Sequence, residues 1–290
     1  MNVVIVGLGE MGASLACDLR QSPQIKLIGV DRNAVSLAYA RKTGLVDETS
    51  QDLATVAAQA DLIILATPVD SIEKMIAQLG QLPLKATVIV TDAGSTKRAI
   101  MAQARQFLLP KGITFIGGHA MAGSHLAGVQ AAKTGMYRQA PYFLMPADEQ
   151  AASRVGDLKD ILAPTGANFI TMSVDEHDDL MAVISDNPHV IAFALMNSAV
   201  NDLGKSQDFG QYVAGGFKDM TRIAASNPQL WSDILLSNQK AVLNNLTSFR
   251  QALDQFQRAI EASDETALLQ LISRAQTSRQ NLLIKRENND

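Results

Sequence analysis

The stretch Val3-Val4-Ile5-Val6-Gly7-Leu8-Gly9-Glu10-Met11-Gly12, followed by a helical run over residues 13–19, decides the fold class of this chain. The β-branched run predicts a buried strand, and the spacing G-x-G-x-x-G predicts a tight turn between that strand and the helix. The first glycine allows the turn, the second lets a pyrophosphate approach the backbone, and the third lets the helix pack against the strand. The helix N-terminus offers free N–H groups and a positive dipole end to the phosphates. We therefore predict that residues 7–12 bind a dinucleotide, the alternative being a tight turn without a ligand.

The end of the second predicted strand, residues 26–30, bears on which dinucleotide is bound. Asp31 follows it, 19 residues after Gly12, near the spacing at which a carboxylate binds the ribose hydroxyls of the cofactor. A carboxylate there repels the 2′-phosphate of NADP, whereas the neighbouring Arg32 is a residue type that holds one. We predict NAD in preference to NADP. The alternative role for Asp31 is to cap the following helix.

The first half of the chain alternates apolar runs with amphipathic helical stretches. The apolar runs predict strands at residues 3–6, 26–30, 62–66, 87–91, 115–117, 142–145 and 168–171. Near-continuous apolar runs are typical of strands that are covered on both faces, and the helices between them make βαβ units. We predict a Rossmann-type, doubly wound, mostly parallel α/β sheet over residues 1–172.

The second half contains almost no strand pattern. Apolar residues recur at helical spacing through residues 180–200, 230–246 and 249–260, and residues 173–176 have the spacing of a capping box. Several of these stretches are apolar on more than one face, and such helices need covering. We predict an all-α domain over residues 173–290 that binds the substrate and forms a homodimer, with a polar tail at its end.

Composition excludes several classes of protein. The chain has 290 residues, is 47% hydrophobic and carries a net charge of −4, so nothing favours nucleic-acid binding. The single cysteine, Cys17, excludes an internal disulfide framework, and no cluster of metal ligands stands out. We expect a cytoplasmic protein, because no signal sequence opens the chain and no apolar run is long enough to span a membrane.

Polar side chains follow three of the predicted strands. Thr67 and Pro68 follow the third, Ser95 follows the fourth, and His119 follows a Gly-Gly pair at the end of the fifth. Because ligands of open α/β sheets gather at the carboxyl ends of the strands, we expect Thr67 and Pro68 to border the dinucleotide. The pKa of histidine suits proton transfer near neutral pH, so His119 is a candidate base, the alternative being a structural histidine. Ser95 is either a site residue or a helix N-cap.

The glycine turn and four later motifs occur in a fixed order. The later ones are Thr91-Asp92-Ala93-Gly94-Ser95-Thr96-Lys97, Gly117-Gly118-His119-Ala120-Met121-Ala122-Gly123-Ser124, Asp175-Glu176-His177-Asp178, and Gly215-Gly216-Phe217-Lys218-Asp219-Met220-Thr221-Arg222-Ile223-Ala224 followed by Asn227-Pro228-Gln229-Leu230-Trp231. Over nearly the whole chain they resemble the prephenate and arogenate dehydrogenases of tyrosine biosynthesis, without the regulatory domain that some members append. The resemblance implies an NAD-dependent oxidative decarboxylation of prephenate to 4-hydroxyphenylpyruvate, or alternatively of arogenate to tyrosine.

The resemblance also implies roles for particular residues. His119 deprotonates the ring hydroxyl of the substrate, and Ser95 hydrogen-bonds His119 or that hydroxyl. Arg222 binds a substrate carboxylate, because its planar guanidinium matches that geometry. The remaining implied residues are His189 beside the nicotinamide and the substrate, Lys218 and Ser124 as helpers in substrate binding, His177 in a capping or packing role, and Trp231 in the core or an interface.

One departure from the family pattern keeps other interpretations open. Where the family has S-H-L-P-H, this chain has Ser185-Asp186-Asn187-Pro188-His189. A carboxylate at Asp186 favours the ammonium of arogenate over the keto group of prephenate, and it also leaves room for a catalytically silent dinucleotide-binding sensor or scaffold. A β-hydroxyacid dehydrogenase is a further alternative, with Lys218 as its catalytic lysine, but the set of His119, Ser95 and Arg222 argues against it.

Overall fold

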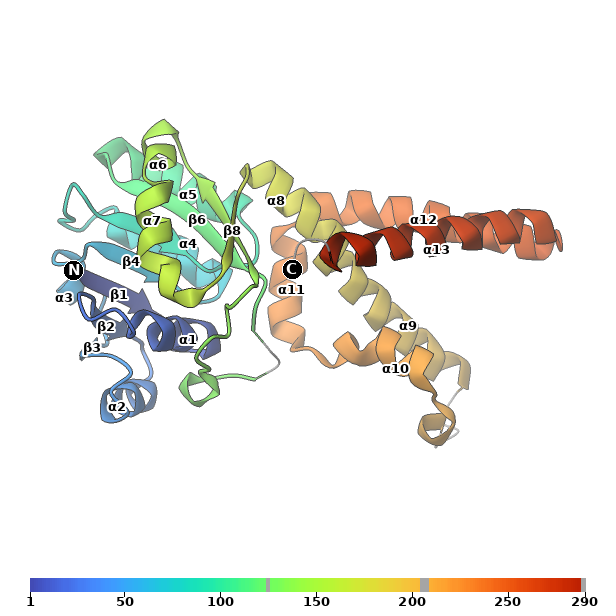
Figure 1. Ribbon diagram of the computed structural model, residues 1–290, viewed down its shortest axis with the longest axis horizontal. Helices are drawn as coiled ribbons and strands as arrows, with labels where there is room; N and C mark the ends of the chain where they lie inside the picture. The colour runs from blue at the N-terminus through green and yellow to red at the C-terminus, as the bar shows by residue number, and fades with distance from the viewer. Residues whose placement is uncertain (124–125, 204–208, 288–290) are drawn as a thin grey trace. The chain divides into compact units, whose positions relative to one another are not determined.

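The computed structural model describes residues 1–123, 126–203 and 209–287 (Figure 1). By compactness the chain forms two units, residues 1–239 and 240–290. The first unit is built on an eight-stranded sheet of order β3-β2-β1-β4-β5-β6-β7-β8. Its strands are β1 Asn2–Val6, β2 Lys26–Val30, β3 Glu48–Ser50, β4 Leu62–Leu65, β5 Ile89–Asp92, β6 Thr114–Ala120, β7 Pro141–Pro146 and β8 Asn168–Thr171. All neighbouring strands are parallel except β6 and β7, which confirms the mostly parallel sheet predicted from the sequence.

Helices cover both faces of the sheet. They are α1 Glu10–Leu19, α2 Ala34–Lys42, α3 Ala54–Ala57, α4 Val69–Leu79, α5 Arg98–Phe107, α6 Glu149–Ser153 and α7 Val155–Leu162. Alternate residues of a strand enter different cores: Val3 and Ile5 pack with residues of α1, α2 and α7, whereas Val4 and Val6 pack with residues of α3, α4 and α5. Burial of each large apolar side chain stabilises the fold by about 1.5–3 kcal/mol. The two cores therefore hold the strands in place, and with them the polar residues at the strand ends.

The strand order reverses between β1 and β4. β1 pairs with β2 on one side and with β4 on the other, and all three are parallel. Ligands of open α/β sheets bind in the crevice at the carboxyl ends of the strands at such a switch point. The residues at this point are the glycine turn after Val6 and the segment after Leu65.

Two strands differ from the sequence-based expectation. β3 was not predicted, because its three residues lie at the sheet edge and include no apolar run. β6 extends three residues beyond residue 117, so that His119 lies inside the strand. There it pairs with Phe143 of the antiparallel β7, and this long-range pairing overrides the two glycines, which in the sequence indicate a turn.

The helical segment begins as predicted at a capping box. The Ser173 side chain accepts a hydrogen bond from Glu176 N, and the Glu176 carboxylate accepts one from Ser173 N. The α-helices that follow in the first unit are α8 Val174–Met181, α9 Asn187–Leu203, α10 Gly215–Thr221 and α11 Pro228–Ser237. A π-helical turn, Ala182–Asp186, joins α8 to α9. It ends two residues before Pro188, which lacks an N–H group and so interrupts regular helical hydrogen bonding.

The stretch of helical spacing over residues 230–246 is divided between two helices, which meet at a break at Asn238. Helix α11 ends at Ser237, and α12, Gln239–Glu261, begins after Asn238. The Asn238 side-chain amide donates to Asp178 O at 2.8 Å and to Asp186 Oδ2 at 2.9 Å. Contacts with residues far along the chain therefore set this break.

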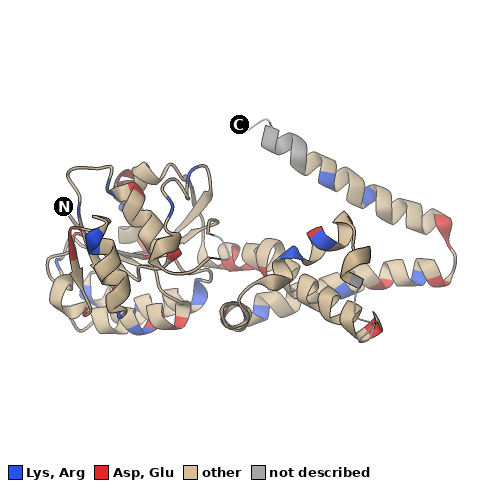
Figure 2. Ribbon diagram, turned by 90° about the horizontal axis from the view of Figure 1, so that it is seen from below, with Lys and Arg blue, Asp and Glu red and all other residues tan. Residues whose placement is uncertain are grey.

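The second unit consists of most of α12 and α13, Glu265–Glu287. Helix α13 is rich in residues of high helix propensity such as Leu, Ala, Gln and Arg. Figure 2 shows basic and acidic residues interspersed along both helices. Within the described residues, no helix is both long and apolar enough to span a bilayer.

Candidate active site

The glycine turn has the shape that a bound pyrophosphate requires. Gly7 has φ +94°, and a Cβ atom on it would lie 2.5 Å from Ala66 O. A Cβ on Gly12 would lie 2.0 Å from Gly7 O, so only glycine lets α1 approach the strand this closely. A Cβ on Gly9 would meet no atom of the described residues within 4 Å, and Gly9 is the N-cap of α1 without a side chain that could satisfy the first N–H groups. The turn, including Leu8, Glu10 and Met11, therefore fits a phosphate at the helix N-terminus.

Asp31 lies against this turn at the end of β2. Its Oδ2 atom accepts a hydrogen bond from Leu8 N at 2.8 Å, and its Oδ1 atom accepts one from Asn33 N at 2.8 Å. The N-cap of α2 is Asn33, which accepts from Val35 N, so the capping role considered for Asp31 is excluded. The neighbouring Arg32 is exposed.

The segment after β4 forms the opposite side of the turn. A Cβ on Gly7 would lie 2.7 Å from Thr67 Cγ2, so Thr67 borders the glycine turn directly. Pro68 is exposed and is the N-cap of α4. Both residues thus lie at the switch point between β1 and β4, where the sequence placed them.

The loop that follows His119 packs onto the start of α1. A Cβ on Gly123 would lie 2.9 Å from Met11 Sδ, and the Tyr137 hydroxyl donates to Met11 O at 2.7 Å. The segment after β6 is therefore brought to the glycine turn of β1. Ser124, predicted to help in substrate binding, lies outside the described residues.

His119 is hydrogen-bonded to a second histidine. Its Nδ1 atom lies 2.9 Å from Nε2 of His177, on α8, and the two rings meet edge to face with centroids 5.1 Å apart. His177 is fully buried, and its Nδ1 atom lies 2.8 Å from Oδ1 of Asp178. The sequence did not predict this pairing. Of the two roles considered for His177, capping is excluded because Ser173 and Glu176 form the capping box, whereas packing agrees with its full burial.

Asp178 in turn is held by the N-terminus of α5. Its carboxylate accepts hydrogen bonds from Lys97 N, at 2.9 and 3.2 Å, and from Arg98 N at 2.9 Å. It is fully buried. A carboxylate at a helix N-terminus is favoured by the helix dipole, so α5 supplies the fixed end of the His119–His177–Asp178 chain.

A buried ion pair lies beside this chain. The Lys97 ammonium, which is fully buried, contacts the Asp92 carboxylate and donates to Gly118 O at 2.7 Å. Burial lowers the pKa of His119 well below its ordinary value of 6.5, and the neighbouring His177 and the positive charge of Lys97 lower that pKa further. His119 is therefore held in the neutral form that can accept a proton.

Ser95 is partly buried in the loop between β5 and α5. The N-cap of α5 is Lys97, so the capping alternative for Ser95 is excluded. Among the residues that the structure describes, His119 is hydrogen-bonded to His177 and not to Ser95.

Three predicted residues lie on the helical segment. The His189 ring stacks on Trp231, with centroids 3.4 Å apart and planes inclined by 21°, and its Nδ1 atom bonds Ser185 O at 2.9 Å. Burial lowers the pKa of His189; the bond to Ser185 opposes that shift, whereas the positive charge of Arg222 adds to it, which places Arg222 near this ring. Lys218 is exposed on α10, one turn before Arg222, which is also exposed.

Asp186 lies one helical turn before His189 and is buried, with 2% of its surface exposed. Its Oδ2 atom accepts the bond from Asn238. Burial raises the pKa of the Asp186 carboxyl; the bond from Asn238 opposes this shift, and the charge of Asp178 adds to it. The Asp186 carboxyl, which departs from the family pattern, is thus close to Asp178, the carboxylate at the end of the His119–His177–Asp178 chain.

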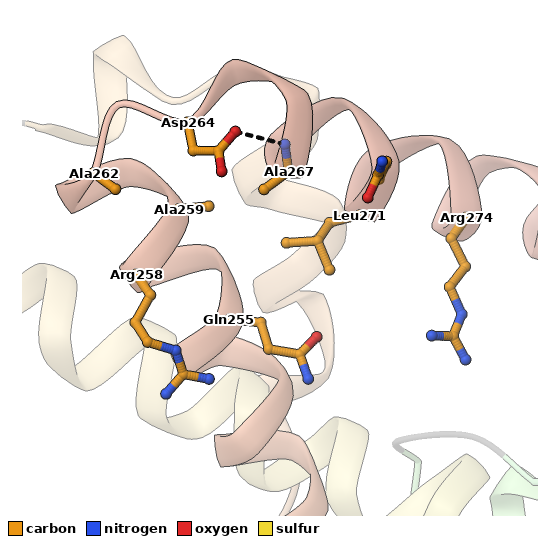
Figure 3. A pocket seen from close by; sticks show the side chains of 9 residues that line it. Gln255, Arg258, Ala259, Ala262, Asp264, Ala267, Leu271 and Arg274 are labelled. Carbon is orange, nitrogen blue, oxygen red and sulfur yellow. Dashed lines mark hydrogen bonds between the residues drawn. The ribbon is translucent and has the colours of Figure 1, made fainter.

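A hollow in the second unit is lined by residues of α12, of α13 and of the turn between them. It has a volume of about 500 Å³ between α12 and α13, and its lining includes Arg258, Asp264 and Arg274 (Figure 3). Asp264 Oδ1 accepts from Ala267 N at 3.0 Å and thereby starts α13. None of the predicted site residues lines this hollow.

Comparisons with known proteins show the family of this chain. A family model described as "Prephenate dehydrogenase, nucleotide-binding domain" matches residues 15–171, and one described as "Prephenate dehydrogenase, dimerization domain" matches residues 173–274. The chain belongs to the prephenate dehydrogenase family. The predicted family, fold class and dehydrogenase activity class are confirmed, whereas the domain boundary near residue 172 and the roles of individual residues stay predictions.

Individual members of the prephenate dehydrogenase family match nearly the whole chain. The prephenate dehydrogenase of Bacillus subtilis is 33% identical over 98% of this chain and 77% of its own length. The solved arogenate dehydrogenase of Synechocystis is 33% identical, with a TM-score of 0.84 over 97% of this chain and 100% of that one. The prephenate dehydrogenase of Aquifex aeolicus, solved with hydroxyphenyl propionate and NAD+, is 31% identical, with a TM-score of 0.89 over 97% and 98%.

Proposed function

We propose that this chain uses NAD to oxidise and decarboxylate prephenate, giving 4-hydroxyphenylpyruvate and carbon dioxide in tyrosine biosynthesis. The observation that carries the proposal is the position of His119, a neutral base near the carboxyl end of β6. The glycine turn that follows β1 lies at the same end of the sheet, where the parallel strands have their carboxyl ends. Family membership supplies the reaction class. The Aquifex aeolicus relative, solved with an aromatic acid and NAD+, supports both ligands.

The residues proposed to hold the cofactor are those around the switch point. Gly7, Gly9 and Gly12 with the N-terminus of α1 receive the pyrophosphate, and Asp31 receives the ribose hydroxyls. Bound NAD supplies the acceptor for the hydrogen and electron pair that leave the alcohol carbon. Thr67 lies against the glycine turn and borders the same ligand.

His119 acts on the ring hydroxyl of the substrate. As the O–H bond breaks, its proton binds His119 and its electron pair forms the C=O bond, which drives the C–H electron pair from the same carbon. The bond to the carboxylate then breaks and carbon dioxide leaves. The electron pair of that bond enters the ring, the C=O pair moves back to the oxygen, and the oxygen regains the proton from His119 as the ring becomes aromatic. General base catalysis of this kind contributes roughly 10²–10⁴-fold to the rate.

The helical segment supplies the groups proposed to bind the substrate anion. Arg222 binds a carboxylate through its paired N–H donors, and Lys218, one turn away, adds positive charge. The His189 ring stacks on Trp231 and its Nδ1 atom is bonded to Ser185 O, so its Nε2 atom is the nitrogen proposed to face the ligands. Ser95 is proposed to hydrogen-bond the substrate hydroxyl, since His119 Nδ1 is already bonded to His177.

Arogenate is the second candidate substrate, and Asp186 is the observation that favours it. A buried carboxylate three residues from His189 would attract the ammonium that arogenate carries where prephenate has a keto group. Asp186→Asn tests this, because an amide oxygen still accepts the bond from Asn238 but carries no charge. A larger loss of kcat/KM with arogenate than with prephenate supports arogenate as the natural substrate.

The test of the proposed function is turnover with all four combinations of prephenate or arogenate with NAD or NADP, measured as the absorbance of the reduced nicotinamide. We expect turnover with prephenate and NAD, abolished by His119→Asn. Turnover with neither substrate, together with tight NAD binding by calorimetry, would support the silent sensor instead.

A further inference from the structure

We propose that His177 and Asp178 are positioning residues that hold His119 in the tautomer whose Nε2 atom is unprotonated and able to take the proton of the substrate hydroxyl. The inference rests on the proposed function, in which His119 is the base. It adds two residues from the helical segment to a site whose catalytic histidine lies on the sheet.

The donor and acceptor of each hydrogen bond in this chain can be assigned by starting from Asp178. Its carboxylate accepts from two backbone N–H groups, those of Lys97 and Arg98, at 2.9–3.2 Å. A carboxylate can only accept hydrogen bonds, so the His177 Nδ1 atom, 2.8 Å away, must carry the proton of that bond.

The proton on His177 Nδ1 determines the state of His119. A neutral imidazole with its proton on Nδ1 has an acceptor at Nε2, so His119 Nδ1, 2.9 Å away, must donate. Neutral His119 therefore has its single proton on Nδ1, which leaves Nε2 with a lone pair. Without His177 either tautomer is available, and the one with Nε2–H cannot act as a base at that atom.

The same chain of bonds stays intact after His119 takes the proton. When the substrate O–H proton binds Nε2, the imidazolium still donates through Nδ1 to His177, which still donates to Asp178. Each N–H dipole in this chain is directed toward the Asp178 carboxylate. Both bonds therefore keep their direction while His119 is protonated, and the ring keeps its orientation.

Water is excluded from this chain. His177 and Asp178 are each 0% exposed, and the Phe143 ring packs edge to face on His177, with centroids 5.4 Å apart. A hydrogen bond in such surroundings meets no competition from solvent and is electrostatically stronger than one in water. The geometry of His119 is therefore fixed before the substrate binds.

Two variants of His177 separate positioning from a merely structural role. His177→Gln places an amide group where Nε2 was, so it still accepts from His119 but no longer reaches Asp178. His177→Asn places its amide where Nδ1 was, so it still reaches Asp178 but no longer accepts from His119. We expect kcat to fall roughly 10²-fold or more in His177→Asn and within about 10-fold in His177→Gln.

The KM values for prephenate and NAD are expected to stay near those of the wild type in both variants, because neither histidine nitrogen binds them in the proposal. A structural role predicts the reverse order, since the bond from His177 helps to hold the Asp178 carboxylate, whose bonds from Lys97 N and Arg98 N tie α8 to the start of α5. An Asn variant that is as active as the Gln variant, or more active, would overturn the proposal.

A second measurement does not depend on turnover. The chain has four histidines, so nitrogen-15 spectra of histidine-labelled protein can be assigned with single substitutions. We expect both His119 and His177 to show a protonated Nδ1 and an unprotonated Nε2 at neutral pH. A protonated Nε2 on His119 in the wild type would refute the tautomer assignment, whereas inactivity with both substrates would refute only the proposed function.

Discussion

At the scale of single residues, the chemistry of His119 is set by neighbours from three segments of chain. Lys97 comes from the loop before α5, His177 comes from α8, and Phe143 comes from β7. Burial, His177 and the charge of Lys97 all lower the pKa of His119. The residue is therefore neutral under conditions in which an exposed histidine would be partly protonated.

This lowered pKa predicts the pH dependence of the reaction. His119 is active as a base only when neutral, so activity is lost as pH falls through its pKa, and that pKa lies well below 6.5. We expect kcat/KM for prephenate to remain level from neutral pH down through 6.5 and to fall only below it. Initial rates across this range check the prediction, corrected at each pH for loss of substrate without enzyme. An acid limb centred at or above 6.5 would contradict it.

At the scale of elements, the turn between β1 and α1 contains one glycine that folding requires and another that folding does not require. Gly12 is required by packing, because its Cβ position lies 2.0 Å from backbone oxygen of Gly7. Gly9 is not required by packing, because its Cβ position is open. Glycine is thus needed at position 12 for packing, whereas at position 9 the proposed reason is ligand binding.

The matched variants Gly9→Ala and Gly12→Ala test this distinction. Gly9→Ala is expected to change the free energy of unfolding by less than about 1 kcal/mol but to weaken NAD binding at least 10-fold, because the methyl group occupies the phosphate position. Gly12→Ala is expected to destabilise the fold by about 2 kcal/mol or more, since the clash is with backbone. Urea unfolding and NAD titration of both variants measure these effects. Equal losses of stability would show that the motif acts only in folding.

At the scale of the whole molecule, the second unit exposes apolar side chains along both of its helices. Leu243, Leu253, Ile260, Leu269, Ile272 and Leu282 are each 56–63% exposed. Exposed apolar surface of this extent is typical of a face that is covered in an assembly. Residues 173–274 also match the dimerization domain of the family, which supports a homodimer through the helical part of the chain.

The proposed homodimer predicts a particle mass of about twice 31.1 kDa by gel filtration with light scattering. Ile272→Glu is expected to raise the dissociation constant of the dimer at least 10-fold, because it buries a charge in an apolar interface. Val35→Glu makes the same change at a side chain that is 74% exposed on α2, in the other unit, and should leave the mass unchanged. A wild-type mass near 31 kDa would refute the dimer.

The sequence by itself determined the features that depend on neighbours along the chain. The glycine spacing predicted the turn at Gly7, alternating strand and helix patterns predicted the sheet, and the spacing of Ser173 and Glu176 predicted the capping box. Each of these signals is complete within a few residues, because strand and helix periods repeat over short stretches. The ordered motifs added the family, since their residue types could be compared one by one.

Only the tertiary structure decided the features that join distant segments. His177 lies 58 positions from His119, so no local pattern could show that the two rings share a hydrogen bond. The helix break at Asn238 likewise depends on Asp178 and Asp186, about 60 and 52 positions away. Such contacts form when packed elements bring side chains together, and their chemistry is a property of the fold. The sequence thus indicated His119 as a candidate base, and the fold determined the hydrogen-bond chain that holds it.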